Sequence, residues 1–247
     1  MASDTGTAVD TERGLVYGPS GKQLDLYRPA KAAGPVPTVL LWHGIGPDER
    51  DVLAPLARTA AARGLLVLVP DWDSGAADGG RSQLLESLAF VHKEAAGPAG
   101  DGEPFVLAGW SAGAGAALGV ALRPEVADGR RPTAVVGLTG RYDLPARTTG
   151  AAPLADLAAG RDPAVPVHLV HGSRDTVLDV RWSRDLAAAL RAAGRAVTLQ
   201  EPATDHAGVI MTEFDPAVAR CRPTTAEHAV RAGHLAAEVL VGACGKP

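Results

Sequence analysis

A serine set between two glycines is the part of the sequence best suited to chemistry. The run Gly109-Trp110-Ser111-Ala112-Gly113 follows the apolar stretch 105–108 and leads into further small residues. A strand that turns this abruptly into a helix leaves almost no room for side chains two residues before and after the serine, and it lifts the hydroxyl above the sheet. The motif therefore predicts that Ser111 is a nucleophile at the end of a buried strand.

A base and an acid at suitable positions follow this serine along the chain. A serine hydroxyl is a weak nucleophile at neutral pH, so it needs a base that is itself oriented by a carboxylate. His206 lies in a polar break after the last expected strand, and Asp175 comes shortly after the buried run 167–170. The order Ser111, Asp175, His206 is a known order for a catalytic triad.

Other acids compete with Asp175 for the third role. Asp143 follows the preceding strand, and Asp179 lies four residues beyond Asp175, so both are rival acids. Asp175 could also cap the next helix or shape its own loop, as aspartates often do. Asp205 is adjacent to His206 and is expected to shape the loop of the histidine.

Two backbone N–H groups are candidates for an oxyanion hole. The Ala112 N–H follows the nucleophile at a helix N-terminus, and the Ile45 N–H lies in the turn His43-Gly44-Ile45-Gly46 after the first parallel strand. Such donors stabilise the negative oxygen that develops when a carbonyl is attacked. His43 and His171 each precede a glycine at a strand end and are expected to pack and hydrogen-bond beneath the site.

The elements that must position these residues follow from hydrophobic patterning. Alternating runs at 14–18 and 23–28 predict an antiparallel hairpin at a sheet edge. Continuous apolar runs predict strands buried on both faces of a parallel sheet, at 38–42, 65–69, 105–108, 133–138 and 167–170, with a further strand at 196–200. Helices are expected at 49–63, 81–95, 112–122, 180–193 and 225–241.

This alternation of strands and helices predicts one α/β domain over residues 13–247. The expected architecture is a doubly wound, mostly parallel sheet of about eight strands with helices on both faces. In such sheets ligands bind beyond the carboxyl ends of the strands, where the candidate residues converge. Residues 1–12 are expected to be a disordered leader, and segment 145–165 is the one region that could form a small lid.

Composition limits the partners. The net charge is −4 with no run of Lys or Arg, so neither nucleic acid nor an anionic membrane surface is expected as a partner. The N-terminus does not have the pattern of a signal peptide, and no apolar stretch approaches the length of a membrane span. Cys221 and Cys244 are expected to be free thiols. These features predict a soluble cytoplasmic protein, either a monomer or a homodimer.

No cofactor or metal is expected. The histidines His43, His171 and His206 are isolated, without the spacing of metal ligands, and the glycine-rich segments do not form a phosphate-binding or dinucleotide-binding motif.

With these motifs in place, the chain resembles the α/β-hydrolase superfamily over nearly its whole length, from the His43-Gly44 turn to Asp205-His206. It is most similar to small serine esterases, carboxylesterases and dienelactone-hydrolase-like members. Two departures carry information. Ile45 stands where the oxyanion turn of kynurenine-formamidase-like esterases commonly has a second glycine, and Ser111 stands where dienelactone hydrolases use cysteine.

These motifs and the resemblance predict hydrolysis of a small or medium carboxylic ester, or a thioester or amide, through an acyl-enzyme. Trp72 and Tyr142 are the expected walls of the substrate pocket, and Trp110 could face either that pocket or the core. An alternative hypothesis is acyl transfer or cyclisation with the same triad. A third hypothesis is a non-catalytic binding protein with this fold. Segment 213–230 either covers the core or binds a partner.

Overall fold

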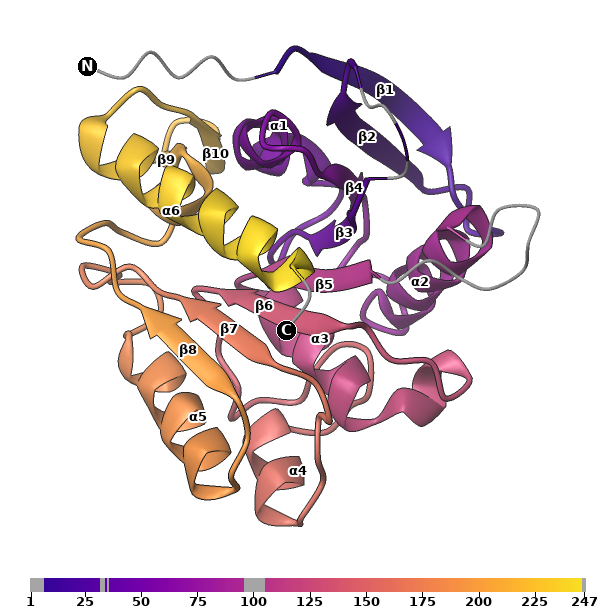
Figure 1. The fold of residues 1–247 in the computed structure, drawn as a ribbon, viewed down its shortest axis with the longest axis vertical. Coiled ribbons are helices and arrows are strands. Elements are labelled where there is room, and N and C mark those ends of the chain that lie inside the picture. Colours follow the sequence, from indigo (N-terminus) through magenta and orange to yellow (C-terminus); the bar gives the residue numbers. More distant parts are fainter. Residues whose placement is uncertain (1–6, 32–33, 35, 96–104, 246–247) are drawn as a thin grey trace.

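A computed structural model describes residues 7–31, 34, 36–95 and 105–245 of the chain (Figure 1). The central feature is an eight-stranded sheet with the strand order β1-β2-β4-β3-β5-β6-β7-β8. Strands β1 and β2 are antiparallel to each other, β2 is antiparallel to β4, and all other neighbours are parallel. The strands are β1 (Val9–Val16), β2 (Gln23–Pro29), β3 (Thr38–Trp42), β4 (Leu66–Pro70), β5 (Phe105–Trp110), β6 (Ala134–Leu138), β7 (Val167–Val170) and β8 (Val197–Gln200). The predicted fold class is confirmed.

Helices cover both faces of this sheet (Figure 1). They are α1 (Ala54–Ala61), α2 (Arg81–Ala95), α3 (Ala112–Leu122), α4 (Pro153–Ala158), α5 (Arg181–Ala192) and α6 (Glu227–Cys244), with the short 3-10 turns η1 (Arg50–Leu53), η3 (Pro124–Ala127) and η4 (Gly208–Ile210). Side chains of one strand alternate between the two layers: Leu40 and Trp42 of β3 belong to the core layer that also contains residues of α2, α3 and α5, whereas Val39 and Leu41 belong to the layer that contains residues of α1 and α6. Because both faces are covered, the central strands carry the continuous apolar runs seen in the sequence.

Two expectations about element boundaries need correction, and one further segment acquires a defined structure. Strand β1 begins at Val9, so residues 9–12 are part of the sheet and not of a leader; residues 1–6 lie outside the described residues. The helix expected at 49–63 starts as the 3-10 turn η1 before it continues as α1. Segment 213–230 contains most of a hairpin of β9 (Thr212–Asp215) and β10 (Arg220–Pro223) ahead of α6.

Segment 145–165 is not a lid. It contains α4, which lies beside α3 and α5 on one face of the sheet (Figure 1). The Thr148 hydroxyl donates to the Ala116 carbonyl of α3 over 2.8 Å, and the Arg123 guanidinium binds the buried Asp156 carboxylate through two hydrogen bonds of 2.8 and 2.7 Å. These contacts hold the segment against the helical layer and not over the nucleophile.

Candidate active site

Ser111 lies at the turn between β5 and α3, as the sequence predicts. Its backbone angles are φ 55° and ψ −118°, a conformation that non-glycine residues rarely adopt. A Cβ on Gly113 would lie 2.6 Å from the carbonyl oxygens of both Trp42 and His43, and a Cβ on Gly109 would collide with the backbone of Gly113. The two glycines are therefore needed because β3, β5 and α3 meet there without space for a side chain.

Asp175 and His206, the acid and base that the sequence predicts, are in direct contact. His206 Nδ1 lies 2.7 Å from Asp175 Oδ2, and Asp175 Oδ1 accepts hydrogen bonds of 2.8 Å from the N–H groups of both Val177 and Leu178. The Asp175 side chain has no exposed surface. Burial alone would raise the pKa of this carboxyl, but hydrogen bonds from His171 and His206 outweigh burial and hold the pKa well below its usual range. Asp175 is therefore a carboxylate at neutral pH, able to orient His206.

The imidazole of His206 lies beside Trp110, the residue that precedes Ser111. The ring centroids of Trp110 and His206 are 5.1 Å apart, and the Trp110 indole N–H donates to the His206 carbonyl over 3.1 Å. Trp110 is almost fully buried, so it packs beneath the elbow and does not line a pocket. Within the described ranges, no hydrogen bond joins the Ser111 hydroxyl to His206, and such bonds are often long in enzymes without substrate.

The rival acids are engaged elsewhere. Asp143 binds the guanidinium of Arg141 through two hydrogen bonds of 2.7 and 3.0 Å. Asp179 accepts a hydrogen bond from the Arg181 N–H at the start of α5. Asp205 accepts one from the Gly208 N–H and shapes the loop, as expected. The geometry therefore favours Asp175 as the partner of His206.

The predicted oxyanion turn lies next to Ser111. A Cβ on Gly44 would be 3.1 Å from Ser111 Cβ and 3.0 Å from the Trp110 ring. Among the described residues, the N–H groups of Ile45 and Ala112 donate to no protein acceptor. Unsatisfied N–H groups on either side of the serine are what a developing oxyanion requires.

The buried side chain of His43 hydrogen-bonds to the backbone of this turn. Its ring is fully buried and stacked on Trp72, with centroids 5.2 Å apart. His43 Nε2 accepts hydrogen bonds from the backbone N–H groups of Glu49, over 3.3 Å, and Trp72, over 3.1 Å, so the proton must be on Nδ1, which donates to the Gly44 carbonyl over 2.9 Å. A neutral imidazole thus ties both ends of the loop 44–49 together.

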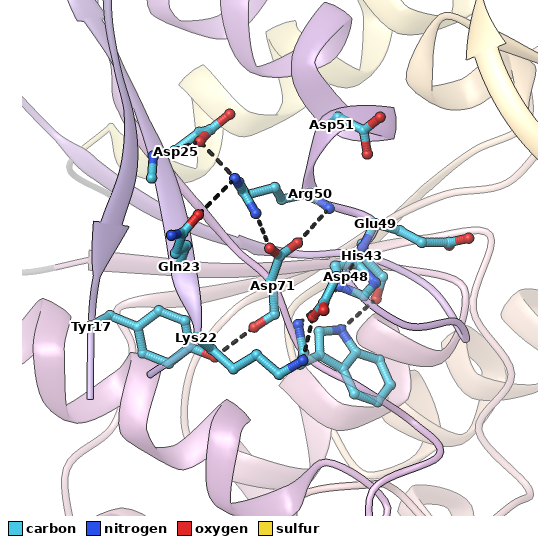
Figure 2. Close-up of polar contacts among 12 residues, drawn as sticks. Tyr17, Lys22, Gln23, Asp25, His43, Asp48, Glu49, Arg50, Asp51 and Asp71 are labelled. Atoms are coloured by element: carbon cyan, nitrogen blue, oxygen red, sulfur yellow. Dashed lines mark hydrogen bonds and ion pairs between the residues drawn. The ribbon is translucent and has the colours of Figure 1, made fainter. Parts of the chain in front are cut away.

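Arg50 anchors the same loop from its far end (Figure 2). Its guanidinium binds the buried carboxylates of Asp25, over 2.9 Å, and Asp71, and its backbone N–H donates to Asp71 over 3.1 Å. These contacts join the start of η1 to the ends of β2 and β4. No local pattern in the sequence indicates this group, because its three residues lie far apart in the chain.

Acidification should destabilise the protein through His43. Burial lowers the pKa of His43 to about 4, whereas an unfolded histidine binds a proton near its ordinary value of about 6.5. Between these values the unfolded state binds more protons, so the free energy of unfolding falls as the pH falls, by up to about 3 kcal/mol for this group. Imidazole NMR should show His43 neutral at pH 5.5 with its proton on Nδ1. A His43 midpoint near 6.5 would contradict this assignment.

The expected pocket residues are wrong. Trp72 and Tyr142 are fully buried in the hydrophobic core, where Trp72 stacks on His43, so neither presents a surface to a substrate. The exposed apolar side chains near the site are instead Ile45, 61% exposed, and Val177, 69% exposed, two residues after Asp175.

His171 and the two cysteines lie as the sequence predicts. His171 is buried as expected, with Nδ1 2.8 Å from the Ser183 hydroxyl and Nε2 shared between the Leu178 carbonyl at 2.8 Å and Asp175 Oδ2 at 3.4 Å. Cys221 and Cys244 are free thiols, as predicted.

The described residues contain no group of three or more His, Cys, Asp or Glu side chains arranged to hold a metal ion. Within the same residues, no helix is both long and apolar enough to cross a membrane.

Comparison with known proteins places this geometry on a known fold. No protein-family model matches the chain, and no curated protein matches its sequence. Solved structures match over nearly the whole chain. A provisionally named dienelactone hydrolase of Klebsiella pneumoniae is 21% identical, with a TM-score of 0.68 over 97% of this chain and 100% of that one. A thermophilic esterase of Thermogutta terrifontis, with butyrate bound, is 18% identical, with a TM-score of 0.67 over 97% and 95%. A bacterial heroin esterase is 17% identical, with a TM-score of 0.70 over 99% and 86%. The chain therefore has the α/β-hydrolase fold.

Proposed function

We propose that the protein is a serine hydrolase that cleaves small or medium carboxylic esters through Ser111, His206 and Asp175. The observation that carries the proposal is the 2.7 Å contact between His206 and the buried Asp175 carboxylate, on the same edge of the sheet as the Ser111 elbow. An imidazole oriented by a carboxylate, on the same sheet edge as a serine in a strand-to-helix elbow, is the arrangement that acyl transfer through a serine needs.

In this mechanism Ser111 Oγ attacks the carbonyl carbon of the ester while His206 takes the hydroxyl proton. The negative oxygen that forms is stabilised by the N–H groups of Ile45 and Ala112. His206 then gives the proton to the departing alcohol, which leaves an acyl-enzyme. A water molecule, deprotonated by His206, attacks the acyl carbon; the bond from that carbon to Ser111 Oγ then breaks, His206 returns the proton to Ser111 Oγ, and the acid is released. Asp175 keeps the imidazole in the reactive tautomer and stabilises its charged form throughout.

The surroundings of the site support a short or medium acyl group. Segment 145–165 packs on α3 and does not close over Ser111. Ile45 and Val177 offer exposed apolar surface near the oxyanion turn and the acid. Among the matched structures are esterases, and one of them has butyrate bound. Together these features favour an open, mildly apolar site over a long enclosed tunnel.

The test is ester turnover combined with active-site labelling. The purified protein should hydrolyse p-nitrophenyl butyrate, and a fluorophosphonate probe should attach to Ser111, as located by peptide mass spectrometry. Pretreatment with the probe should abolish turnover in proportion to labelling. A protein that neither hydrolyses short p-nitrophenyl esters nor reacts at Ser111 would contradict the proposed function.

A further inference from the structure

Glu49 places a carboxylate directly against the oxyanion turn. A Cβ on Gly46 would lie 2.6 Å from the carboxyl carbon of Glu49 and 2.8 Å from both of its oxygens. Gly46 follows Ile45, whose N–H is the proposed oxyanion donor. The carboxylate is also close enough to Cys221 of β10 to raise the pKa of that thiol, after burial as the main cause. Glu49 is also the residue that precedes η1, and η1 packs against β10.

Among the described residues, the cations near Glu49 are each bound by another group. Lys22 pairs with Asp48 over 2.5 Å, Arg50 pairs with Asp25 and Asp71, and Arg220 pairs with Asp51 and also donates to the Asp48 carbonyl. The Glu49 carboxylate itself makes no hydrogen bond or ion pair within the described part of the chain. Figure 2 shows its side chain extending away from Arg50 and the two carboxylates that Arg50 binds, Asp25 and Asp71. Three cations thus face five carboxylates, and Glu49 is the one without a partner.

A half-buried carboxylate without a partner is unfavourable. Burial raises the pKa of Glu49, and the charge of Arg220 offsets this only in part. Surface carboxylates normally gain hydration or an ion pair; this one has lost hydration without gaining a pair. A positively charged ligand at this position would supply the missing counter-charge.

That ligand can be part of the substrate only if the Glu49 carboxylate lies within a few bonds of an ester held at Ser111. Gly44 contacts Ser111, and Gly46 lies two residues further along, a span of at most about 7 Å. A substituent of several atoms on an ester held at Ser111 could therefore reach the Glu49 carboxylate across the turn.

We propose that Glu49 is a specificity-determining residue that binds a positively charged amine group of the ester substrate. This inference rests on the proposed function, since it needs an ester held at Ser111. It adds a substrate class, esters that carry a protonated or quaternary amine, to an otherwise general hydrolase.

The test compares two esters that differ only in charge. Butyrylcholine and 3,3-dimethylbutyl butyrate have the same shape, with a quaternary nitrogen in one and a carbon atom in the other. The ratio of their kcat/KM values, measured by acid release, should favour the cationic ester. Glu49→Gln should lower this ratio on the order of tenfold, the effect of removing a partly buried carboxylate–ammonium contact. The neutral ester serves as an internal reference, so a general loss of activity cancels in the ratio.

Two further variants sharpen the result. Arg220→Gln removes the cation that partly offsets the Glu49 charge, so it should raise the ratio. Glu12→Gln makes the same substitution on the exposed outer strand β1 and should leave the ratio within about twofold. Turnover of the neutral ester with a ratio unchanged by Glu49→Gln would overturn this inference alone. Absence of turnover of both esters, together with no labelling of Ser111, would instead overturn the proposed function.

Discussion

Replacing Ser111 by alanine should lower kcat/KM for p-nitrophenyl butyrate by at least about 1,000-fold and leave the fold intact. The proposed mechanism has no substitute nucleophile, so what remains is the modest rate that the oxyanion donors and substrate binding can support. Stability should change little, because the Ser111 hydroxyl makes no hydrogen bond within the described part of the chain. Alanine also meets about the same strain as serine at a φ of 55°.

The measurement has two parts. Steady-state kinetics give the loss of activity, and urea unfolding should show a change in the free energy of unfolding below about 1 kcal/mol. Ser173→Ala is a matched control, because Ser173 is an exposed loop serine that hydrogen-bonds the Pro202 carbonyl and has no part in the mechanism. Retention of more than a tenth of the activity by Ser111→Ala would assign the nucleophile elsewhere.

The turn at Ser111 and the positions of Asp175 and His206 could be predicted because their signals are local. The two glycines of the elbow are required by contacts with immediately adjacent strands, and this requirement is visible as a short motif. The apolar runs of the central strands likewise report burial on both faces. His206 and Asp175 follow from their places after strand ends, since parallel strands bring their carboxyl ends to one edge.

The pocket residues could not be predicted in the same way. Whether an aromatic residue after a strand faces the cleft or the core depends on partners that are distant in sequence. Trp72 is buried because His43 stacks on it, and Tyr142 is buried in a core cluster with Leu169 and Leu186. Neither contact has a local signature.

The same reason explains the two polar features that the sequence did not reveal. The anchor formed by Arg50, Asp25 and Asp71 joins residues 21 to 25 positions apart. The unpaired state of Glu49 is visible only once all neighbouring cations are assigned to other acids. Charge balance around a site is a property of the folded arrangement, and composition cannot supply it.

Replacing Asp175 by asparagine should reduce kcat on the order of 10,000-fold, as for the corresponding change in serine proteases. His206 Nδ1 lies 2.7 Å from Asp175 Oδ2, and a carboxylate there can only accept a hydrogen bond. Asparagine can turn its NH₂ group toward the ring, which would favour the tautomer with its proton on Nε2, facing away from Asp175. That nitrogen could then no longer take the proton of Ser111.

Asp143→Asn provides the matched control for this assignment. Asp143 is the rival acid from the preceding strand, but its carboxylate is bound to Arg141 on both oxygens, so the substitution should change kcat by less than about threefold. Stability distinguishes the cause of any loss in the Asp175 variant: a folded protein with unchanged KM and greatly reduced kcat points to the imidazole and not to unfolding. A large loss of kcat in Asp143→Asn, together with an active Asp175→Asn, would assign the role of the acid to Asp143, which follows β6. The buried Asp175 carboxylate would then serve only to close its own loop through Val177 and Leu178.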